Sequence, residues 1–188
     1  MVVLEGVSTR DAILNASMSE LERVGLRKLS LVDVARTAGV SRQTVYRYFR
    51  DRDELVTAVV RRDEDAILQA TRSATEHIDD LREALEVGIA IVLRRAREHP
   101  VLDALLATEG DVLVPFLASP SSPVLRVARP VVEELAAARL PGLGVGRLRI
   151  FADAIARLLV SYTVSTPDYP IDEVAEVLAS ICVDGLIP

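Results

Sequence analysis

The sequence predicts an all-α protein with a small N-terminal head and a larger helical body. Hydrophobic residues make up 50% of the 188 positions and aromatic residues only 4%, so aliphatic side chains must form the core. Leu, Val and Ala pack well between helices, and they recur here at helical spacing. Charge divides the chain, because residues 1–62 carry eleven Arg or Lys against eight Asp or Glu, whereas residues 63–188 carry eleven against twenty. We therefore expect two domains that meet near residue 62.

Three short helices are predicted in the head. Gly25 ends the first helix, since glycine adopts the left-handed conformation that stops a helix. Ser30 and Ser41 precede the second and third helices as N-cap residues, and Gly39 supplies the turn between them. The predicted helices cover about residues 9–24, 31–38 and 42–49.

The body is predicted to consist of further helices, several of them limited by proline. Asp51 and Glu54 form a capping box that begins a long helix between head and body. Pro100 ends the next helix, and five prolines between residues 101 and 143 predict shorter or kinked helices there, with a loop at 119–123. The remaining predicted helices cover about residues 52–77, 80–99, 145–165 and 171–184.

The third helix has two chemically different faces. Gln43, Tyr46 and Arg47 lie on one side at spacings of three and four residues, opposite Val45 and Phe49. Arginine bonds guanine bidentately, glutamine bonds adenine, and a tyrosine meets a thymine methyl group or a phosphate. With the caps and the turn glycine, this face predicts a helix-turn-helix over about residues 30–49 that binds DNA. The alternative is a solvated charged face on an ordinary helix pair.

Hydroxyl and basic side chains around that face are candidates for phosphate contacts. Ser30, Ser41 and Thr44 lie near helix N-termini, where free backbone amides suit phosphate oxygens. Arg52 is placed to hold the flanking DNA backbone. The predicted DNA-binding residues are Ser30, Ser41, Arg42, Gln43, Thr44, Tyr46, Arg47, Tyr48 and Arg52.

The stretch from about residue 9 to residue 60 resembles the N-terminal domain of TetR-type transcriptional regulators. The resemblance lies in VARTAGVS at 34–41, in TVY at 44–46 followed by YF at 48–49, and in DEL at 53–55. It implies a homodimer that binds a palindromic operator, usually represses, and releases DNA when a small molecule enters the C-terminal domain. Gln43, Tyr48 and Arg50 stand where the family often has glycine, histidine and proline. We expect these departures to alter operator choice rather than the fold.

The resemblance also implies that the last two helices form a four-helix dimer interface. Their broad apolar stripes agree with that role. Cys182 is interpreted as interface packing rather than a redox sensor, because no basic residue within three positions lowers its pKa. The predicted interface residues are Phe151, Ile155, Leu158, Leu159, Tyr162, Val174, Leu178, Ile181 and Cys182.

Other kinds of site have little support in the sequence. There is no Gly-rich phosphate loop, no nucleophile elbow and no paired Cys and His, so we predict no catalytic residue and no cofactor. His77 and His99 are isolated, which argues against a metal site. No run of 18 apolar residues and no signal-peptide pattern occurs, and Cys182 is the single cysteine. These features predict a cytoplasmic protein without a membrane span.

The predicted protein is therefore a homodimeric TetR-like repressor of operator DNA. Residues 1–62 form the DNA-binding domain, and residues 63–188 form the effector-binding and dimerisation domain. The scarcity of aromatic residues favours a small lipophilic, aliphatic effector, whose binding residues the sequence does not identify. One alternative is an activator or a ligand-independent regulator. The other is a helical small-molecule-binding protein or an enzyme with a vestigial head.

Overall fold

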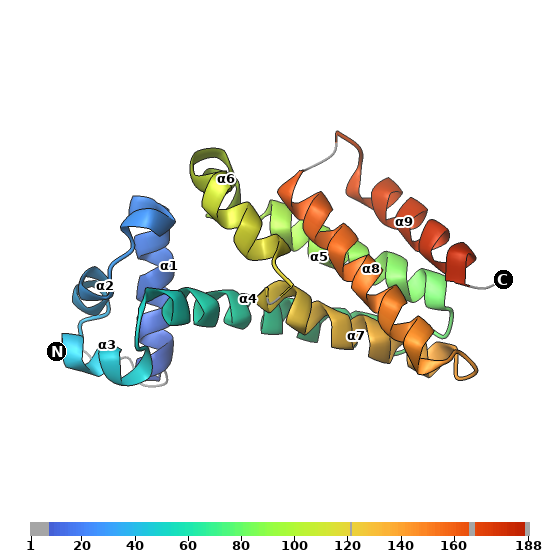
Figure 1. Cartoon of the computed structure of the whole chain (residues 1–188), viewed down its shortest axis with the longest axis horizontal. Coiled ribbons are helices and arrows are strands. Elements are labelled where there is room, and N and C mark those ends of the chain that lie inside the picture. Colours follow the sequence, from blue (N-terminus) through green and yellow to red (C-terminus); the bar gives the residue numbers. More distant parts are fainter. Residues whose placement is uncertain (1–7, 121, 166–167, 187–188) are drawn as a thin grey trace.

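The computed structural model describes residues 8–120, 122–165 and 168–186. It contains nine helices and, within those residues, no strand, which confirms the predicted all-α class. The helices are α1 (Thr9–Lys28), α2 (Leu31–Thr37), α3 (Arg42–Tyr48), α4 (Arg52–Thr75), α5 (Leu81–Arg97), α6 (Leu102–Ala118), α7 (Pro123–Arg139), α8 (Val145–Val164) and α9 (Ile171–Leu186). Figure 1 shows α1 to α3 at one end of an elongated molecule, α5 and α7 to α9 toward the other, and α4 and α6 between them.

The predicted caps position the helices of the head. The Ser30 hydroxyl accepts a hydrogen bond from the Val32 backbone N–H at 3.2 Å, and Ser41 accepts from the Thr44 N–H at 3.0 Å. Asp51 accepts from the Glu54 N–H at 2.8 Å, as a capping box requires. In a capping box the Glu54 carboxylate would also accept a hydrogen bond from the backbone N–H of Asp51. Here it accepts from the Arg50 N–H, one residue earlier.

Gly25 interrupts α1 as predicted. Its φ of 78° and ψ of 176° lie outside the helical region, so the regular helix stops there and one further turn continues to Lys28. Gly39 also has a positive φ, 67°, and makes the turn between α2 and α3. Both positions use the left-handed backbone that glycine adopts without strain.

The proline-rich region forms two long helices rather than short ones, and α6 is kinked, as the prediction of shorter or kinked helices allows. Pro115 and Pro130 lie inside α6 and α7, where buried leucines and valines on either side hold the helices against the core. The kink in α6 occurs at Glu109, with φ −136° and ψ 26°, rather than at a proline. The predicted loop at 119–123 joins these helices, and its residue Ser121 lies outside the described residues. Thr166 and Pro167, between α8 and α9, also lie outside them.

The buried apolar residues form two separate cores. The proximal core joins the head to α6 and the C-terminal part of α8, and includes Val45, Leu55, Leu105, Leu113 and Val160. The distal core is formed by α5, α7, α8 and α9, and includes Leu85, Ala136, Leu148, Ile155 and Leu178. None of the described helices combines the length and the apolar character needed to cross a membrane.

Candidate functional site

The helix α3 has the two faces that its sequence predicts. Val45 is fully buried and Phe49, which follows the helix, is 3% exposed, so these side chains fix α3 on the head. On the opposite side Gln43, Tyr46 and Arg47 are exposed, and Tyr46 reaches 53%. A large aromatic side chain left this open on a small domain is typical of a binding surface.

Five of the predicted DNA-binding residues surround one open depression of the surface. They are Ser41, Gln43, Thr44, Tyr46 and Arg47. The hydroxyl oxygens of Ser41 and Thr44 lie 2.8 Å apart at the N-terminus of α3. The depression therefore combines hydroxyl, amide, aromatic and guanidinium groups, which are the groups that bind base edges and phosphates.

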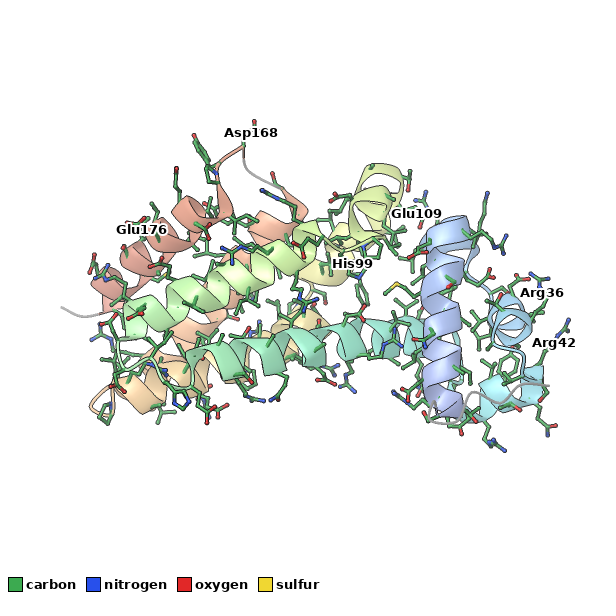
Figure 2. All side chains as sticks on the ribbon, turned by 180° about the vertical axis from the view of Figure 1, so that it is seen from behind. Arg36, Arg42, His99, Glu109, Asp168 and Glu176 are labelled. Carbon is green, nitrogen blue, oxygen red and sulfur yellow. The ribbon has the colours of Figure 1, made fainter. Side chains whose placement is uncertain are left out.

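The other predicted DNA-binding residues lie around this depression. Arg42 is exposed and extends from the outer end of the head (Figure 2). The Arg47 guanidinium lies over the Tyr48 ring, 5.4 Å from its centroid, so these two side chains act together. Ser30 is half-buried as the cap of α2, and the Arg52 guanidinium bonds the Arg27 carbonyl at 3.4 Å.

Arg36 is a candidate that the sequence interpretation missed. It lies in the last turn of α2, is exposed, and points away from the body at the same end of the head as Arg42 (Figure 2). Its guanidinium pairs with Asp33 at 2.7 Å. The sequence feature that could have indicated Arg36 is its place as a basic residue in the last turn of α2, the first helix of the motif.

A large cavity that is partly open to solvent lies between the head and the body. Its volume is about 180 Å³, and a second chamber of about 90 Å³ adjoins it. Side chains of α1, α4, α5, α6, α7 and α8 line the larger chamber, and most of them are aliphatic. The six residues that line both chambers are Glu64, Ile67, Val92, Leu117, Val124 and Thr163. Since an apolar cavity of roughly 150 Å³ stays dry and binds benzene, this space suits a small apolar ligand.

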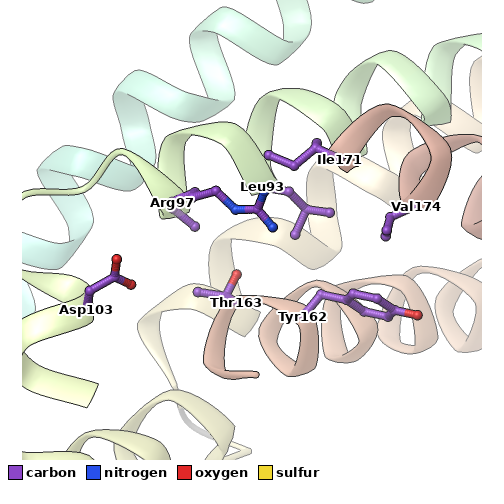
Figure 3. A pocket seen from close by; sticks show the side chains of 8 residues that line it. Leu93, Arg97, Asp103, Tyr162, Thr163, Ile171 and Val174 are labelled. Atoms are coloured by element: carbon purple, nitrogen blue, oxygen red, sulfur yellow. The ribbon is translucent and has the colours of Figure 1, made fainter. Parts of the chain in front are cut away.

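Figure 3 shows a different recess, which lies among Leu93, Arg97, Asp103, Tyr162, Thr163, Ile171 and Val174. Its volume is about 10 Å³, the size of a single water molecule at most. The recess mixes polar and apolar groups. The space available for an organic ligand is therefore in the cavity between α1, α4 and α6.

Two family profiles match this chain, one for each part. Residues 13–59 match the family described as bacterial regulatory proteins, tetR family. Residues 80–183 match the family described as bacterial tetracyclin repressor, C-terminal domain. The chain belongs to the TetR family. It is therefore a TetR-family helix-turn-helix transcriptional regulator, as the N-terminal motif predicts.

Individual TetR-family relatives agree with this assignment. The chain is 31% identical over 134 residues to Rv1255c of Mycobacterium tuberculosis, an uncharacterized HTH-type transcriptional regulator. That match covers 71% of this chain and 62% of the relative, so this chain matches less than two thirds of that protein. The HTH-type regulator AlkX of M. tuberculosis is 24% identical over 169 residues, which cover 89% of this chain and 80% of that protein.

A solved structure shows the same TetR-family fold. The repressor AlkX of Dietzia sp. strain DQ12-45-1b is 26% identical, and the superposition covers 95% of each chain with a TM-score of 0.74. That protein is implicated in the biodegradation of n-alkanes. These relatives are transcriptional regulators.

In this TetR-family chain, the residues predicted for the dimer interface divide into two groups. Five of them are buried in the distal core of the same chain, namely Phe151, Ile155, Leu159, Val174 and Leu178. Leu158, Tyr162 and Cys182 are half-buried, and Ile181 is 63% exposed. The sequence shows which helices are apolar but does not separate the inner face from the outer one.

Exposed apolar residues that the prediction omitted also lie on these two helices. Ile150 on α8 is 73% exposed, and Val177 on α9 is 53% exposed four residues before Ile181. Burial raises the pKa of the Cys182 thiol, which favours the protonated form and agrees with a packing role. The outer stripe of α8 and α9 is therefore formed mainly by Ile150, Val177 and Ile181.

Two polar contacts join the head to α6. The Glu109 carboxylate accepts a hydrogen bond at 2.9 Å from the backbone N–H of Arg27, in the turn that follows Gly25. Arg27 also forms an ion pair with Asp111. A Cβ atom at Gly25 would lie 2.5 Å from Glu109 Oε1, so glycine is needed for this close approach. Figure 2 shows Glu109 beside α1.

The two histidines lie apart from one another. His99 Nε2 lies 3.4 Å from Asp63 Oδ2 at the edge of the cavity, and its Nδ1 accepts a hydrogen bond from the Val101 N–H. Within the described part of the chain, no three His, Cys, Asp or Glu side chains are grouped so that they could hold a metal ion.

Proposed function

We propose that this TetR-family regulator is a repressor that binds a palindromic operator as a homodimer and releases it when a small lipophilic effector enters the cavity. The head of residues 1–62 reads DNA, and the body of residues 63–188 binds the effector and the partner subunit. Because α4 continues unbroken through the boundary at residue 62, movement of its C-terminal half is transmitted to the head.

The observation that carries this proposal is the double role of α6. Leu105, Leu113 and Leu117 of this helix line the cavity, while Glu109 of the same helix holds the turn at Gly25 in the head. A ligand that displaces α6 therefore also displaces the contact that orients α1. Such a ligand releases DNA only if it binds the DNA-incompetent arrangement more tightly than the competent one.

The proposed dimer brings two heads to successive major grooves. Half-sites of a palindromic operator lie about 34 Å apart, so the distance between the two α3 helices decides whether both bind. The outer stripe of Ile150, Val177 and Ile181 supports this dimer, because large apolar side chains are exposed on both α8 and α9, and Val177 and Ile181 lie one turn apart on α9. Aliphatic relatives of n-alkanes are reasonable effectors, since the cavity is aliphatic and AlkX of Dietzia is implicated in n-alkane biodegradation.

The first experiment selects operator sequences from a random DNA pool at fixed salt near the physiological concentration. An inverted repeat is expected. Arg42→Ala and Tyr46→Ala should each weaken binding to that repeat by roughly tenfold to a hundredfold, since a good base contact contributes about 1–3 kcal/mol. Arg72→Ala on α4 is the matched control and should bind normally. Unchanged binding by both head variants would overturn the assignment of α3.

The dimer is tested separately by light scattering coupled to gel filtration. Ile181→Asp places a charge on the outer stripe and should convert the dimer to a monomer that retains its helical circular dichroism. Tyr169→Asp is the control, since Tyr169 is 67% exposed but lies before α9. A dimeric Ile181→Asp variant would contradict an interface on this stripe.

A further inference from the structure

Glu64 is a buried acid at the junction of the two chambers of the cavity. It lies on α4 and lines both chambers. Neither of its carboxyl oxygens is accessible to solvent, and neither has a hydrogen-bond partner within the described residues. An unpartnered buried polar group is unfavourable and rare in folded proteins, so this one calls for a functional explanation.

The surroundings of Glu64 are almost entirely aliphatic. In the smaller chamber, Thr163 is the other polar side chain of the lining. In the larger chamber the remaining polar side chains are Asp63, Arg95, His99 and Thr163, and Asp63 faces His99 at 3.4 Å. Asp63, Arg95 and His99 retain contact with solvent, so they form a polar rim, whereas the Glu64 carboxyl lies inside.

The charge state of Glu64 limits what it can bind. Its pKa is raised to about 8, chiefly by burial and also by Asp65 and Asp63, while Arg61 and Arg126 oppose the shift. At neutral pH the group is therefore mainly a carboxylic acid, with one O–H donor and a carbonyl acceptor. A hydroxyl group can satisfy both, because it accepts from the acid O–H and donates to the acid carbonyl.

We propose that Glu64 is the polar anchor of the effector site and that its ligand is an uncharged aliphatic molecule with a single hydroxyl head, such as a primary alkanol. This inference rests on the proposed function, because it takes the cavity to be the effector site. The alkyl chain lies along the aliphatic walls of the two chambers, and the hydroxyl meets Glu64 at their junction. A plain alkane fits the walls but leaves the acid unpartnered. A fatty carboxylate brings a negative charge toward Asp63 and Asp65, which disfavours it.

The proposal is tested by isothermal titration calorimetry on the dimer in the absence of DNA. The probes are 1-decanol, decane, decylammonium and decanoate, which share one chain length. We expect 1-decanol to bind at least tenfold more tightly than the other three. Among 1-hexanol, 1-octanol and 1-decanol, the affinity should rise about fourfold for each added methylene that is buried.

Variants of Glu64 separate an uncharged anchor from a carboxylate. Glu64→Gln keeps a donor and an acceptor without a charge, so it should bind 1-decanol within about threefold of the wild type. Glu64→Leu should lose at least tenfold for 1-decanol and retain or gain affinity for decane. Asp65→Asn, on the exposed neighbouring residue, is the matched control. Circular dichroism and gel filtration establish that each variant remains a folded dimer.

Three outcomes would overturn the proposal. Equal affinity for decane and 1-decanol would show that Glu64 does not contribute to recognition of the ligand. Tighter binding of decylammonium, lost in Glu64→Gln, would assign Glu64 as a carboxylate for cations. Binding of none of the probes by the folded dimer would also overturn the assignment. Operator release is measured separately, so 1-decanol that binds without releasing DNA would count against the proposed regulation and not against the anchor.

Discussion

The two cores of this molecule differ in how completely they are filled. The distal core of α5, α7, α8 and α9 encloses a cavity of about 50 Å³, which also reaches α4. The proximal core, which joins the head to α6, contains or borders chambers of about 180 and 90 Å³. A filled core resists deformation, whereas a core with empty space loses contacts and accepts a ligand or a shifted helix. The structure therefore places its rigid part at the α8–α9 end and its adjustable part beside the DNA-binding head.

The contacts between helices also differ between the proximal and the distal core. The head meets α6 through the Glu109 carboxylate at a glycine turn and the Arg27–Asp111 ion pair, together with the apolar side chains of the proximal core. The helices of the distal core instead meet over long apolar faces. A small ligand can change the first kind of contact more easily than the second, because fewer buried groups must move.

The largest expected effect comes from matched leucine deletions in the two cores. Leu148 in the distal core and Leu113 in the cavity wall are both 6% exposed. Leu148→Ala should lower the free energy of unfolding by about 4 kcal/mol and Leu113→Ala by about 2 kcal/mol, because the cavity already deprives Leu113 of some contacts. Urea denaturation at one protein concentration measures both. Equal losses would contradict the claim that the cores differ.

A smaller effect on the free energy of unfolding is expected when a change of pH alters the protonation of Glu64. Its pKa in the folded protein, about 8, exceeds its ordinary value of 4.5, so the folded state binds more protons between these pH values. Stability therefore falls as pH rises from about 5 to 8. Glu64→Gln should escape this loss and should gain on the wild type by about 3 kcal/mol over that range, at about 1.4 kcal/mol per pH unit.

Denaturation curves of the wild type and Glu64→Gln at pH 5, 6.5 and 8 test this expectation. The charged groups Asp63, Asp65, Arg61 and Arg126 are present in both proteins, so the difference between the two curves isolates Glu64. Asp65→Asn serves as the control for removing a nearby exposed carboxylate. A difference that does not depend on pH would mean that Glu64 is ionised in the folded protein.

The smallest expected effect concerns the contact between α1 and α6. Gly25→Ala places a Cβ 2.5 Å from Glu109 Oε1 at a φ of 78°. Gly39→Ala imposes similar backbone strain, φ 67°, but its Cβ meets nothing within 4 Å. The backbone strain should lower the free energy of unfolding of each variant by about 1 kcal/mol. Gly25→Ala should lower it further, because Glu109 must also move.

Glu109 can be tested directly by its effect on signal transmission. Glu109→Gln retains an acceptor for the Arg27 N–H, whereas Glu109→Ala removes it. We expect Glu109→Ala to weaken the operator release caused by 1-decanol while leaving 1-decanol binding unchanged, and Glu109→Gln to resemble the wild type. Fluorescence anisotropy of labelled operator measures release. Normal release by Glu109→Ala would show that the signal does not pass through this contact.

The sequence by itself determined the all-α class, the caps of the head and the division of α3 into two faces. These features depend on local interactions within a few residues, such as the hydrogen bond that the Thr44 N–H donates to the Ser41 hydroxyl and the spacing of Tyr46 from Val45. The family resemblance also lies in this region, which the matched profiles confirm.

Three features were decided only by the tertiary structure: the position of the kink in α6, the choice of outward-facing apolar residues on α8 and α9, and the place of Glu64 in the lining of a cavity. Each of these depends on segments far apart in the chain, such as Glu109 and Arg27, or Glu64 and Thr163. A helical pattern shows that a residue lies on an apolar face, but two apolar faces on one helix look alike until their neighbours are known. Ile155 and Ile181 illustrate this, since both belong to apolar stripes and only the packing of the other helices buries the first and exposes the second.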